Sequence, residues 1–351
     1  MNHLYREILL QNSMEQYEWS QTVPPMKLPF RHLFKRKRLL VFALITAAFS
    51  ICFLLNNAWT YDGPHIANFS SFQNLNNHAH SSTCSKKASR RGPHQRVISF
   101  SFFGRIKSRR GYFEGIEINA NLIRELYPNW IMRLYHDIRK GRLNTTLDRL
   151  ELSYGETLDL CFVGNIPGYG NLIGSPQTMW RFLTLTDPLV DISLFRDLDS
   201  NLNDREVLAV REWLEMTYPL HVMRDNPFHS MPILAGMWGA RLDLGHRYLW
   251  KNVTDQMMAA NAKALYIGED QEALKQFVWP LAEIKGFLLQ HDSYFCGNKV
   301  YKLAGDSRPF PSCRDAKRGL NFIGSRRRVD RTPMLKECPE LCRLKSECLY
   351  C

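Results

Sequence analysis

Residues 190–210 read VDISLFRDLDSNLNDREVLAV, an apolar run followed by acidic and polar residues. Apolar side chains run up to Phe195, as in a buried strand, and two aspartates, Asp197 and Asp199, follow one residue apart. Asn203 and Glu206 then form an N-x-x-E helix start, in which the amide side chain can accept an orphan backbone N–H. The pattern therefore places two carboxylates at the tip of a buried strand, directly before a helix.

The chain on either side of this stretch alternates between strands and helices. Strands are expected at 97–103, 130–137, 158–164, 221–225, 233–240 and 286–295, and helices at 115–127, 143–152, 176–187, 204–216 and 270–281. Such alternation predicts an α/β fold with a doubly wound, mostly parallel sheet flanked by helices. Ligands of such sheets bind outside the carboxyl ends of the strands, which is where Asp197 and Asp199 are expected.

The N-terminal part has the pattern of a membrane anchor. Residues 39–55, LLVFALITAAFSICFLL, are uncharged and mostly apolar, and they follow RHLFKRKR, in which five of eight residues are basic. A single transmembrane helix with the N-terminus in the cytosol fits this asymmetry better than a cleaved signal peptide or a buried core helix. The sequence thus predicts a cytosolic tail (1–38), a signal-anchor (39–55), a stem or linker (56–95), a lumenal domain (96–335) and a Cys-rich tail (336–351).

The formal net charge of +12 argues little about partners. Residues 1–38 carry +4 and residues 56–95 carry +3, so only +5 belongs to residues 96–351. No zinc-finger, RNP or helix-turn-helix pattern is present in the sequence, and no nucleic-acid partner is expected.

Two features suit a lumenal location for the C-terminal portion. N-x-S/T sequons occur at Asn68, Asn144 and Asn252, all beyond the predicted span. Eight of the nine cysteines also lie beyond it, which favours disulfides over a zinc site made by the four cysteines of the tail. The pairing of eight cysteines stays open at this stage.

Three uses of the paired aspartates can be compared. An EF-hand calcium loop fails, because Leu202 replaces the glycine and Leu208 replaces the final acid. An aspartyl-phosphate phosphatase would use Asp197 as a nucleophile, but the cation Arg196 precedes it. A clamp for a divalent cation and a diphosphate needs one or two carboxylates at the metal, and the D-x-D spacing supplies them. A pair of solvated loop acids is the simplest alternative.

At this point the chain resembles the membrane-anchored GT-A-fold glycosyltransferases of the Golgi, and within them a largely uncharacterised animal family with R-D-L-D-S and A-V-x-E-W-L motifs. The matching pieces fall in order from about residue 97 to 324: VISFSFFG, YPNWIMRLYHD, WRFLTLTD, RDLDSNLNDREVLAVREWL, HVMRDNPFH, ILAGMWGAR, GEDQEALKQFVWP, HDSYFC, RPFPSCR and NFIG. The basic loop GRIKSRR departs from the pattern after the first strand. The resemblance implies a GT-A-like, Rossmann-type sheet in a single-pass type II protein of the Golgi membrane.

The resemblance also implies roles on the donor side. Asp197 and Asp199 would hold Mn²⁺ or Mg²⁺ and the nucleotide-sugar, for which a UDP-sugar is favoured over a GDP-sugar. His291 would complete the metal shell, or would simply be hydrogen-bonded in a turn. Arg181 would lie near the donor phosphates or sugar, or would form a surface ion pair with Asp187 or Asp191. Arg196 is expected to hold an acid of the following helix rather than a phosphate.

Further residues are candidates for the acceptor side. Asp270 and Asp225 are the nominated catalytic bases, although Asp270 could equally cap a helix. His229 would line the same substrate pocket, and Trp238 would stack on a sugar or pack in the core. The expected activity is metal-dependent, hexosyltransferase-like transfer to a glycan or glycoprotein, retaining or inverting; a catalytically silent glycan-binding or scaffolding domain is the main alternative.

Overall fold

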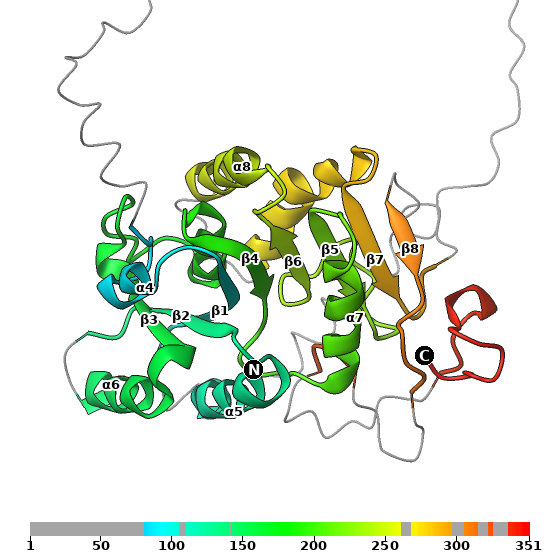
Figure 1. The fold of residues 1–351 in the computed structure, drawn as a ribbon, viewed down its shortest axis with the longest axis horizontal. Coiled ribbons are helices and arrows are strands. Elements are labelled where there is room, and N and C mark those ends of the chain that lie inside the picture. The colour runs from blue at the N-terminus through cyan, green and yellow to red at the C-terminus, as the bar shows by residue number, and fades with distance from the viewer. Residues whose placement is uncertain are drawn as a thin grey trace, which may run out of the picture. The chain divides into compact units, whose positions relative to one another are not determined.

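A computed structural model describes residues 81–104, 110–139, 142–260, 268–296, 305–314, 322–325 and 336–351. Their strands form one eight-stranded sheet in the order β3-β2-β1-β4-β6-β5-β7-β8 (Figure 1). The strands are β1 (Gln95–Phe102), β2 (Ile131–His136), β3 (Leu158–Phe162), β4 (Val190–Phe195), β5 (Leu220–Arg224), β6 (Trp238–Arg241), β7 (Leu288–Asp292) and β8 (Asp306–Arg308). Among them only β6 pairs antiparallel, which confirms the predicted α/β class with a mostly parallel sheet.

Helices cover both faces of this sheet. One face carries α5 (Arg110–Leu126), α6 (Arg142–Tyr154) and α7 (Asp204–Leu214), and the other carries the 3₁₀ helix η5 (Gln177–Thr186), α8 (Arg247–Ala260) and α9 (Glu269–Ala273). Figure 1 shows α5 and α6 on the opposite side from α8. Neighbouring strand residues supply the two cores alternately, so that Leu194 joins the α5–α7 core and Phe195 the η5–α8 core.

No helix among these described residues is both long and apolar enough to cross a membrane. The predicted signal-anchor at 39–55 and the sequon at Asn68 lie outside the described residues. Asn252 is exposed on α8, where it is accessible to a modifying enzyme, and Asn144 falls within α6. Glycosylation of these asparagines stays a prediction.

The helix boundaries follow local sequence signals. Helix α5 ends before Tyr127-Pro128, because the residue before a proline disfavours helical backbone angles. Helix α7 begins where predicted: the Asn203 side chain accepts a hydrogen bond from the backbone N–H of Glu206 at 3.0 Å. The start of α7 therefore fixes the end of the loop that carries Asp197 and Asp199.

Two expected elements take a different form. Residues 177–186 make 3₁₀ rather than α-helix, and the hydroxyls of Thr184 and Thr186 donate to the carbonyls three residues earlier, at 3.1 and 2.8 Å. The helix expected at 270–281 is divided into α9, the π-helix η6 (Leu274–Val278) and the 3₁₀ helix η7 (Trp279–Glu283). Pro280 has no N–H to continue an α-helical ladder, which accounts for the break.

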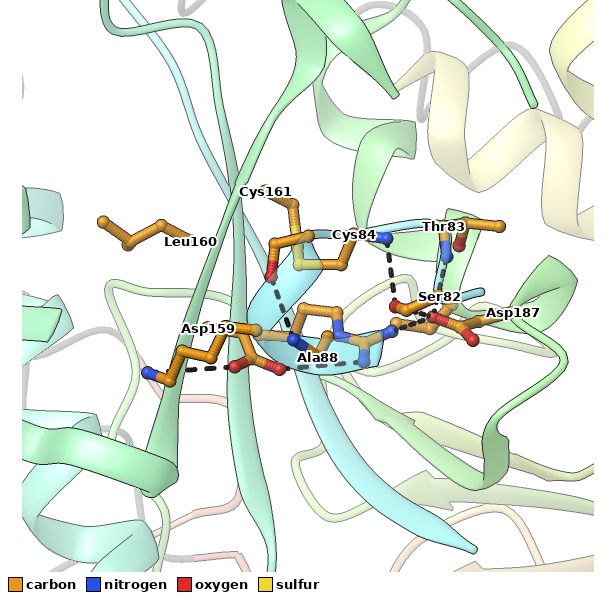
Figure 2. Close-up of a disulfide and its surroundings, with 12 residues drawn as sticks. Ser82, Thr83, Cys84, Ala88, Asp159, Leu160, Cys161 and Asp187 are labelled. Atoms are coloured by element: carbon orange, nitrogen blue, oxygen red, sulfur yellow. Dashed lines mark hydrogen bonds and ion pairs between the residues drawn. A yellow bond between two sulfur atoms is a disulfide. The ribbon is translucent and has the colours of Figure 1, made fainter. Parts of the chain in front are cut away.

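Residues 81–95 belong to the folded domain, whereas the sequence assigned them to an exposed linker. Cys84 is disulfide-bonded to Cys161 of β3, and Ser85 caps the short helix α4 (Lys86–Arg91) (Figure 2). Asp187 accepts hydrogen bonds from Ser82 and Thr83 of this segment and from Arg133 of β2. The sequence suggested a linker because residues 56–95 are rich in Ser, Asn and His and have little apolar periodicity. The segment is instead attached by a disulfide and by buried polar contacts, which periodicity does not reveal.

The C-terminal tail is also attached to the domain. Cys296, just after β7, pairs with Cys342, and Cys313 pairs with Cys348, while Cys338–Cys351 closes the tail on itself. All eight cysteines beyond the predicted span thus form disulfides, as the sequence predicted in preference to zinc. The pairings themselves come only from the structure.

Candidate functional site

A cavity of about 870 Å³ lies at the carboxyl ends of β1 and β4. The chain passes from β1 to β2 and β3 on one side and then returns to β4 on the other, so this is where the strand order reverses. Ser101, Phe102 and Phe103 at the end of β1 line the cavity. So do five of the predicted site residues and two of their neighbours, namely Arg181, Asp197, Asp199, His229 and Asp270 with Gly236 and Glu269.

The loop after β4 presents the two aspartates to this cavity. Arg196 is buried, and its Nε donates to Glu206 at 2.7 Å, which confirms the expected contact with an acid of the next helix. From the other side, Asn119 of α5 donates to the carbonyl of Ser200 at 3.0 Å. Asp197 and Asp199 thus project from a loop that is fixed at both ends.

Sequence reasoning missed Asn119. The signal was a polar residue on the apolar face of the predicted helix, between Ile116 and Ile123, where a buried amide needs hydrogen-bond partners. Both groups of the amide are used, because Asn119 also accepts from the backbone N–H of Leu202 at 3.4 Å. Asn119 is therefore a positioning residue for the aspartate loop.

Arg181 connects the two acidic sides of the cavity. Its Nη1 donates to Asp197 Oδ1 and to the carbonyl of Arg196, and its Nη2 donates to Asp270 Oδ2 at 2.8 Å. Burial lowers the pKa of Arg181, but Asp197 and Asp270 outweigh that effect, so the guanidinium is charged at every accessible pH. The expected surface pair with Asp187 or Asp191 is not formed.

Gly236 leaves room for the Asp197 carboxylate. A Cβ at position 236 would overlap Asp197 Oδ2 and come within 2.7 Å of its Cγ. Residues 234–237, which the sequence assigned to a strand, instead line the cavity before β6 begins at Trp238. Gln271 accepts a hydrogen bond from the backbone N–H of Ala235 and so ties this wall to α9.

Asp270 lies on the opposite wall, in the first turn of α9. The helix begins after Gly268, whose φ of 97° is the left-handed conformation that glycine adopts without strain. Asp270 is therefore not the helix cap. Burial raises the pKa of Asp270, and the proximity of Arg181 offsets part of that rise. A raised pKa makes a carboxylate a better proton acceptor, which suits the role of a general base.

Glu269, next to Asp270, was not singled out from the sequence. Its Oε1 accepts a hydrogen bond from Thr178 Oγ1 at 3.0 Å, whereas its buried Oε2 has no hydrogen-bond partner among the described residues. The side chain is 5% exposed and belongs to the cavity wall. An unpaired buried carboxylate oxygen favours a cation or a hydroxyl ligand nearby.

His229 lines the cavity as a neutral imidazole. Burial lowers its pKa to about 4, and its Nδ1 accepts the backbone N–H of Asn226 at 3.1 Å. The proton of the neutral ring is therefore on Nε2. At neutral pH His229 can donate a hydrogen bond to a substrate oxygen.

The structure does not bring Asp225 to the cavity. Its carboxylate is fully buried and bonds to Arg205 at 3.0 Å, Arg314 at 2.7 Å, Ser293 at 2.8 Å and the backbone N–H of Ile323 at 2.9 Å. Because Asp225 is fully buried in these contacts and does not line the cavity, it joins β5 to the C-terminal segments rather than acting as a base. This corrects the expected catalytic role.

His291 and Trp238 are also placed elsewhere. His291 of β7 is fully buried, with Nδ1 2.8 Å from His221 Nε2 and Nε2 3.3 Å from Glu212, so no ring nitrogen is available to a metal in the cavity. Trp238 is fully buried against Phe195, with ring centroids 4.1 Å apart. It packs in the core, which was the alternative to sugar stacking.

A divalent cation fits the remaining donor set. Asp197 and Asp199 offer hard oxygen ligands at the cavity, and the side chain of Asp197 is 45% exposed. Among the described residues, three potential metal ligands gather only at Asp292, Cys296 and Cys342, where the two cysteines are joined as a disulfide. A cation held by one or two carboxylates would need further oxygens from a ligand such as a diphosphate.

No protein-family model matches the chain, and no curated protein matches it. Among solved structures, the chain is similar to the crystal structure of S. aureus TarS 1–349, with a TM-score of 0.36 and 12% sequence identity. The match covers 53% of this chain and 55% of that chain, so this chain spans about half of the TarS structure. The function is accordingly inferred from the residues of the cavity.

Proposed function

We propose that the chain is a glycosyltransferase that moves a sugar from a nucleotide-sugar to a hydroxyl of a glycan or glycoprotein. One observation carries the proposal: Asp197 and Asp199 leave β4 at the point where the strand order reverses and share a cavity with Arg181 and Asp270. The mostly parallel sheet fits the GT-A-like fold that the sequence motifs imply, and the cavity volume suits a nucleotide-sized ligand.

The acidic side chains call for a cation when a diphosphate binds. Among the described residues that line the cavity, Asp197, Asp199, Glu269 and Asp270 are acidic and Arg181 is the one basic side chain. A nucleotide diphosphate adds further negative charge to this set. We propose that Asp197 and Asp199 hold Mn²⁺ or Mg²⁺, which would neutralise the charge on the departing diphosphate.

The part of the cavity lined by Asp270 and His229 suits an acceptor hydroxyl. Asp270 is the carboxylate there whose pKa burial raises, and it is the proposed base in an inverting reaction. His229 donates from Nε2 and would orient a sugar oxygen, since its ring stays neutral. A retaining reaction would leave Asp270 with an orienting role only.

Ligand-dependent thermal stability of the full chain tests the donor site. The chain is heated alone and with UDP or GDP, each with and without Mn²⁺, and a ligand present at 100 times its Kd should add about 2.7 kcal/mol to the free energy of unfolding. Asp197→Asn and Asp199→Asn are expected to abolish a shift that needs both nucleotide and metal. Glu125→Gln, which changes an exposed acid of α5, is the matched control and should keep it.

Two outcomes would contradict the proposal. A folded chain that gains no stability from any nucleotide with Mn²⁺ would favour the silent glycan-binding or scaffolding domain. Stabilisation that persists in both aspartate variants would place nucleotide binding elsewhere. A positive shift is followed by release of nucleotide from UDP-sugars, in which Asp270→Asn should lower turnover at least 100-fold if Asp270 is the base.

A further inference from the structure

Arg181 occupies the same carboxylate that the proposed cation would use. Its Nη1 contacts Asp197 Oδ1, while Nη2 is 2.8 Å from Asp270 Oδ2. The Arg181 side chain is 5% exposed and that of Asp270 10%, but that of Asp197 is 45% exposed. Arg181 and Asp197 both line the cavity, and the exposed part of the Asp197 carboxylate leaves a cation room to approach it.

The described residues leave Arg181 incompletely hydrogen-bonded. Its Nε is buried and has no hydrogen-bond partner among the described residues, and the neighbouring Glu269 Oε2 is unpaired as well. Buried polar atoms without partners are rare in folded proteins and call for an explanation such as an absent ligand. Both atoms belong to side chains that line the cavity.

We propose that Arg181 is an internal counter-cation, which competes with the divalent metal for Asp197 and makes metal binding depend on a diphosphate. This inference rests on the proposed function. When a metal takes Asp197, Nη2 of Arg181 keeps its bond to Asp270, and Nη1 loses a carboxylate partner inside a buried site. A diphosphate supplies a new anionic acceptor for Nη1, so metal and nucleotide stabilise one another.

Mn²⁺ binding without any nucleotide tests the competition. Affinity is measured on the full chain by the loss of the free Mn²⁺ electron-spin-resonance signal, for wild type and for Arg181→Met. Arg181→Met should bind Mn²⁺ about tenfold more tightly, which corresponds to about 1.4 kcal/mol. Arg96→Met removes an exposed cation at the other end of β1 and should leave the affinity unchanged. Equal or weaker binding by Arg181→Met would overturn the inference.

Asp270→Asn gives the opposite prediction from the same geometry. With Asp270 neutral, Arg181 has Asp197 as its one carboxylate partner at the cavity, so Mn²⁺ alone should bind severalfold more weakly. The double variant Arg181→Met/Asp270→Asn should bind like Arg181→Met, because Asp270 then has no cation through which to act. A double variant weaker than Arg181→Met would mean that Asp270 ligates the metal directly, and the inference would be wrong.

The double variant also guards against misfolding. Arg181→Met leaves Asp270 buried without its counter-ion, whereas the double variant removes both charges of that pair. If Arg181→Met fails to fold, tight Mn²⁺ binding by the double variant still supports the competition, and wild-type affinity contradicts it.

The coupling between ligands separates this inference from the proposed function. UDP affinity is measured with and without Mn²⁺, and the factor by which Mn²⁺ tightens UDP binding should fall about tenfold in Arg181→Met. If UDP binds no variant, the donor site itself is refuted and the coupling with it. If UDP-sugar is consumed in the presence of a chelator and Mn²⁺ binds neither wild type nor Arg181→Met, the transferase survives and the counter-cation role is refuted.

Discussion

At the scale of single residues, the position of the Asp197 carboxylate requires a glycine at position 236. A Cβ there would overlap Asp197 Oδ2, and the wall on which Gly236 lies is held by Gln271. Gly236→Ala is therefore expected to displace the carboxylate and abolish the stabilisation by nucleotide with Mn²⁺. In the absence of ligand it should lower the free energy of unfolding by less than about 2 kcal/mol.

A mutant cycle shows whether Gly236→Ala acts through Asp197. In an Asp197→Ala background the overlapping atoms are gone, so adding Gly236→Ala should change neither ligand response nor stability further. Both quantities are read from thermal unfolding with and without UDP and Mn²⁺. A further large loss in the double variant would mean that the glycine serves the backbone rather than the aspartate.

Some of the site residues predicted from the sequence line the cavity, and others are buried elsewhere. Asp197 and Asp199 could be predicted because they follow a strand, and Arg181, His229 and Asp270 because they lie in motifs that the family resemblance supplies. All five line the cavity. Asp225 also follows a strand, but its buried carboxylate forms ion pairs with two arginines from distant segments, Arg205 and Arg314. His291 lies two residues after Leu289 on β7, so both side chains point to the same face of the sheet. That face packs against the α5–α7 core rather than the cavity. A short motif does not show which face of the sheet a side chain points to, or which residues from distant segments will pair with it.

At the scale of elements, the start of α7 determines the shape of the aspartate loop. Asn203 caps this helix through Glu206 N, and Glu206 in turn accepts from Arg196 at the other end of the loop. Asn203→Ala should lower the free energy of unfolding in urea by about 1 kcal/mol. Because the loop loses an attachment, the affinity for UDP with Mn²⁺ should fall as well.

A conservative variant makes this prediction specific. Asn203→Ser keeps an oxygen that can accept the Glu206 N–H, so it should restore both stability and ligand affinity to near the wild-type values. If Asn203→Ser is as unstable as Asn203→Ala, the side chain contributes packing rather than a cap. If stability falls but affinity does not, the cap does not control the loop.

The elements themselves were predicted where periodicity was strong. β1 to β5 and β7, together with α5 and α7, have apolar patterns that the final packing keeps. β8 and α8 were missed: β8 is three residues long and exposed, and α8 buries only part of one face. In η5, two threonine hydroxyls donate to carbonyls three residues earlier, in keeping with its 3₁₀ geometry. The spacing of apolar residues cannot predict such bonds.

At the scale of the whole domain, buried histidines make stability depend on pH. His136 is 4% exposed, and burial lowers its pKa to about 4. His221 and His291 are fully buried; burial lowers the pKa of both, and for His221 the His291 ring and Arg196 add to the effect. Each is neutral when folded and binds a proton near pH 6.5 when unfolded.

The sign of the effect follows from proton uptake. Below about pH 6.5 the unfolded chain binds more protons than the folded chain, so the free energy of unfolding should fall as the pH is lowered towards 4. The slope should approach about 1.4 kcal/mol per pH unit for each such histidine. Asp225 acts in a lower range: its two arginines hold its pKa down against the effect of burial, so its contribution is lost only below the usual range of an aspartate.

Urea unfolding of the non-reduced chain between pH 7.5 and 4.5 measures this slope. His136→Gln should reduce the slope by the share of one histidine, because it removes one of the groups that bind a proton only on unfolding. Asn252→Gln changes an exposed residue of α8 that has no titratable group and should leave the slope unchanged. A flat profile between pH 6.5 and 5 would mean that the buried rings are protonated in the folded state. The His221–His291 contact would then join two cations in a dry core, which the observed packing could not accommodate without rearranging β5 and β7.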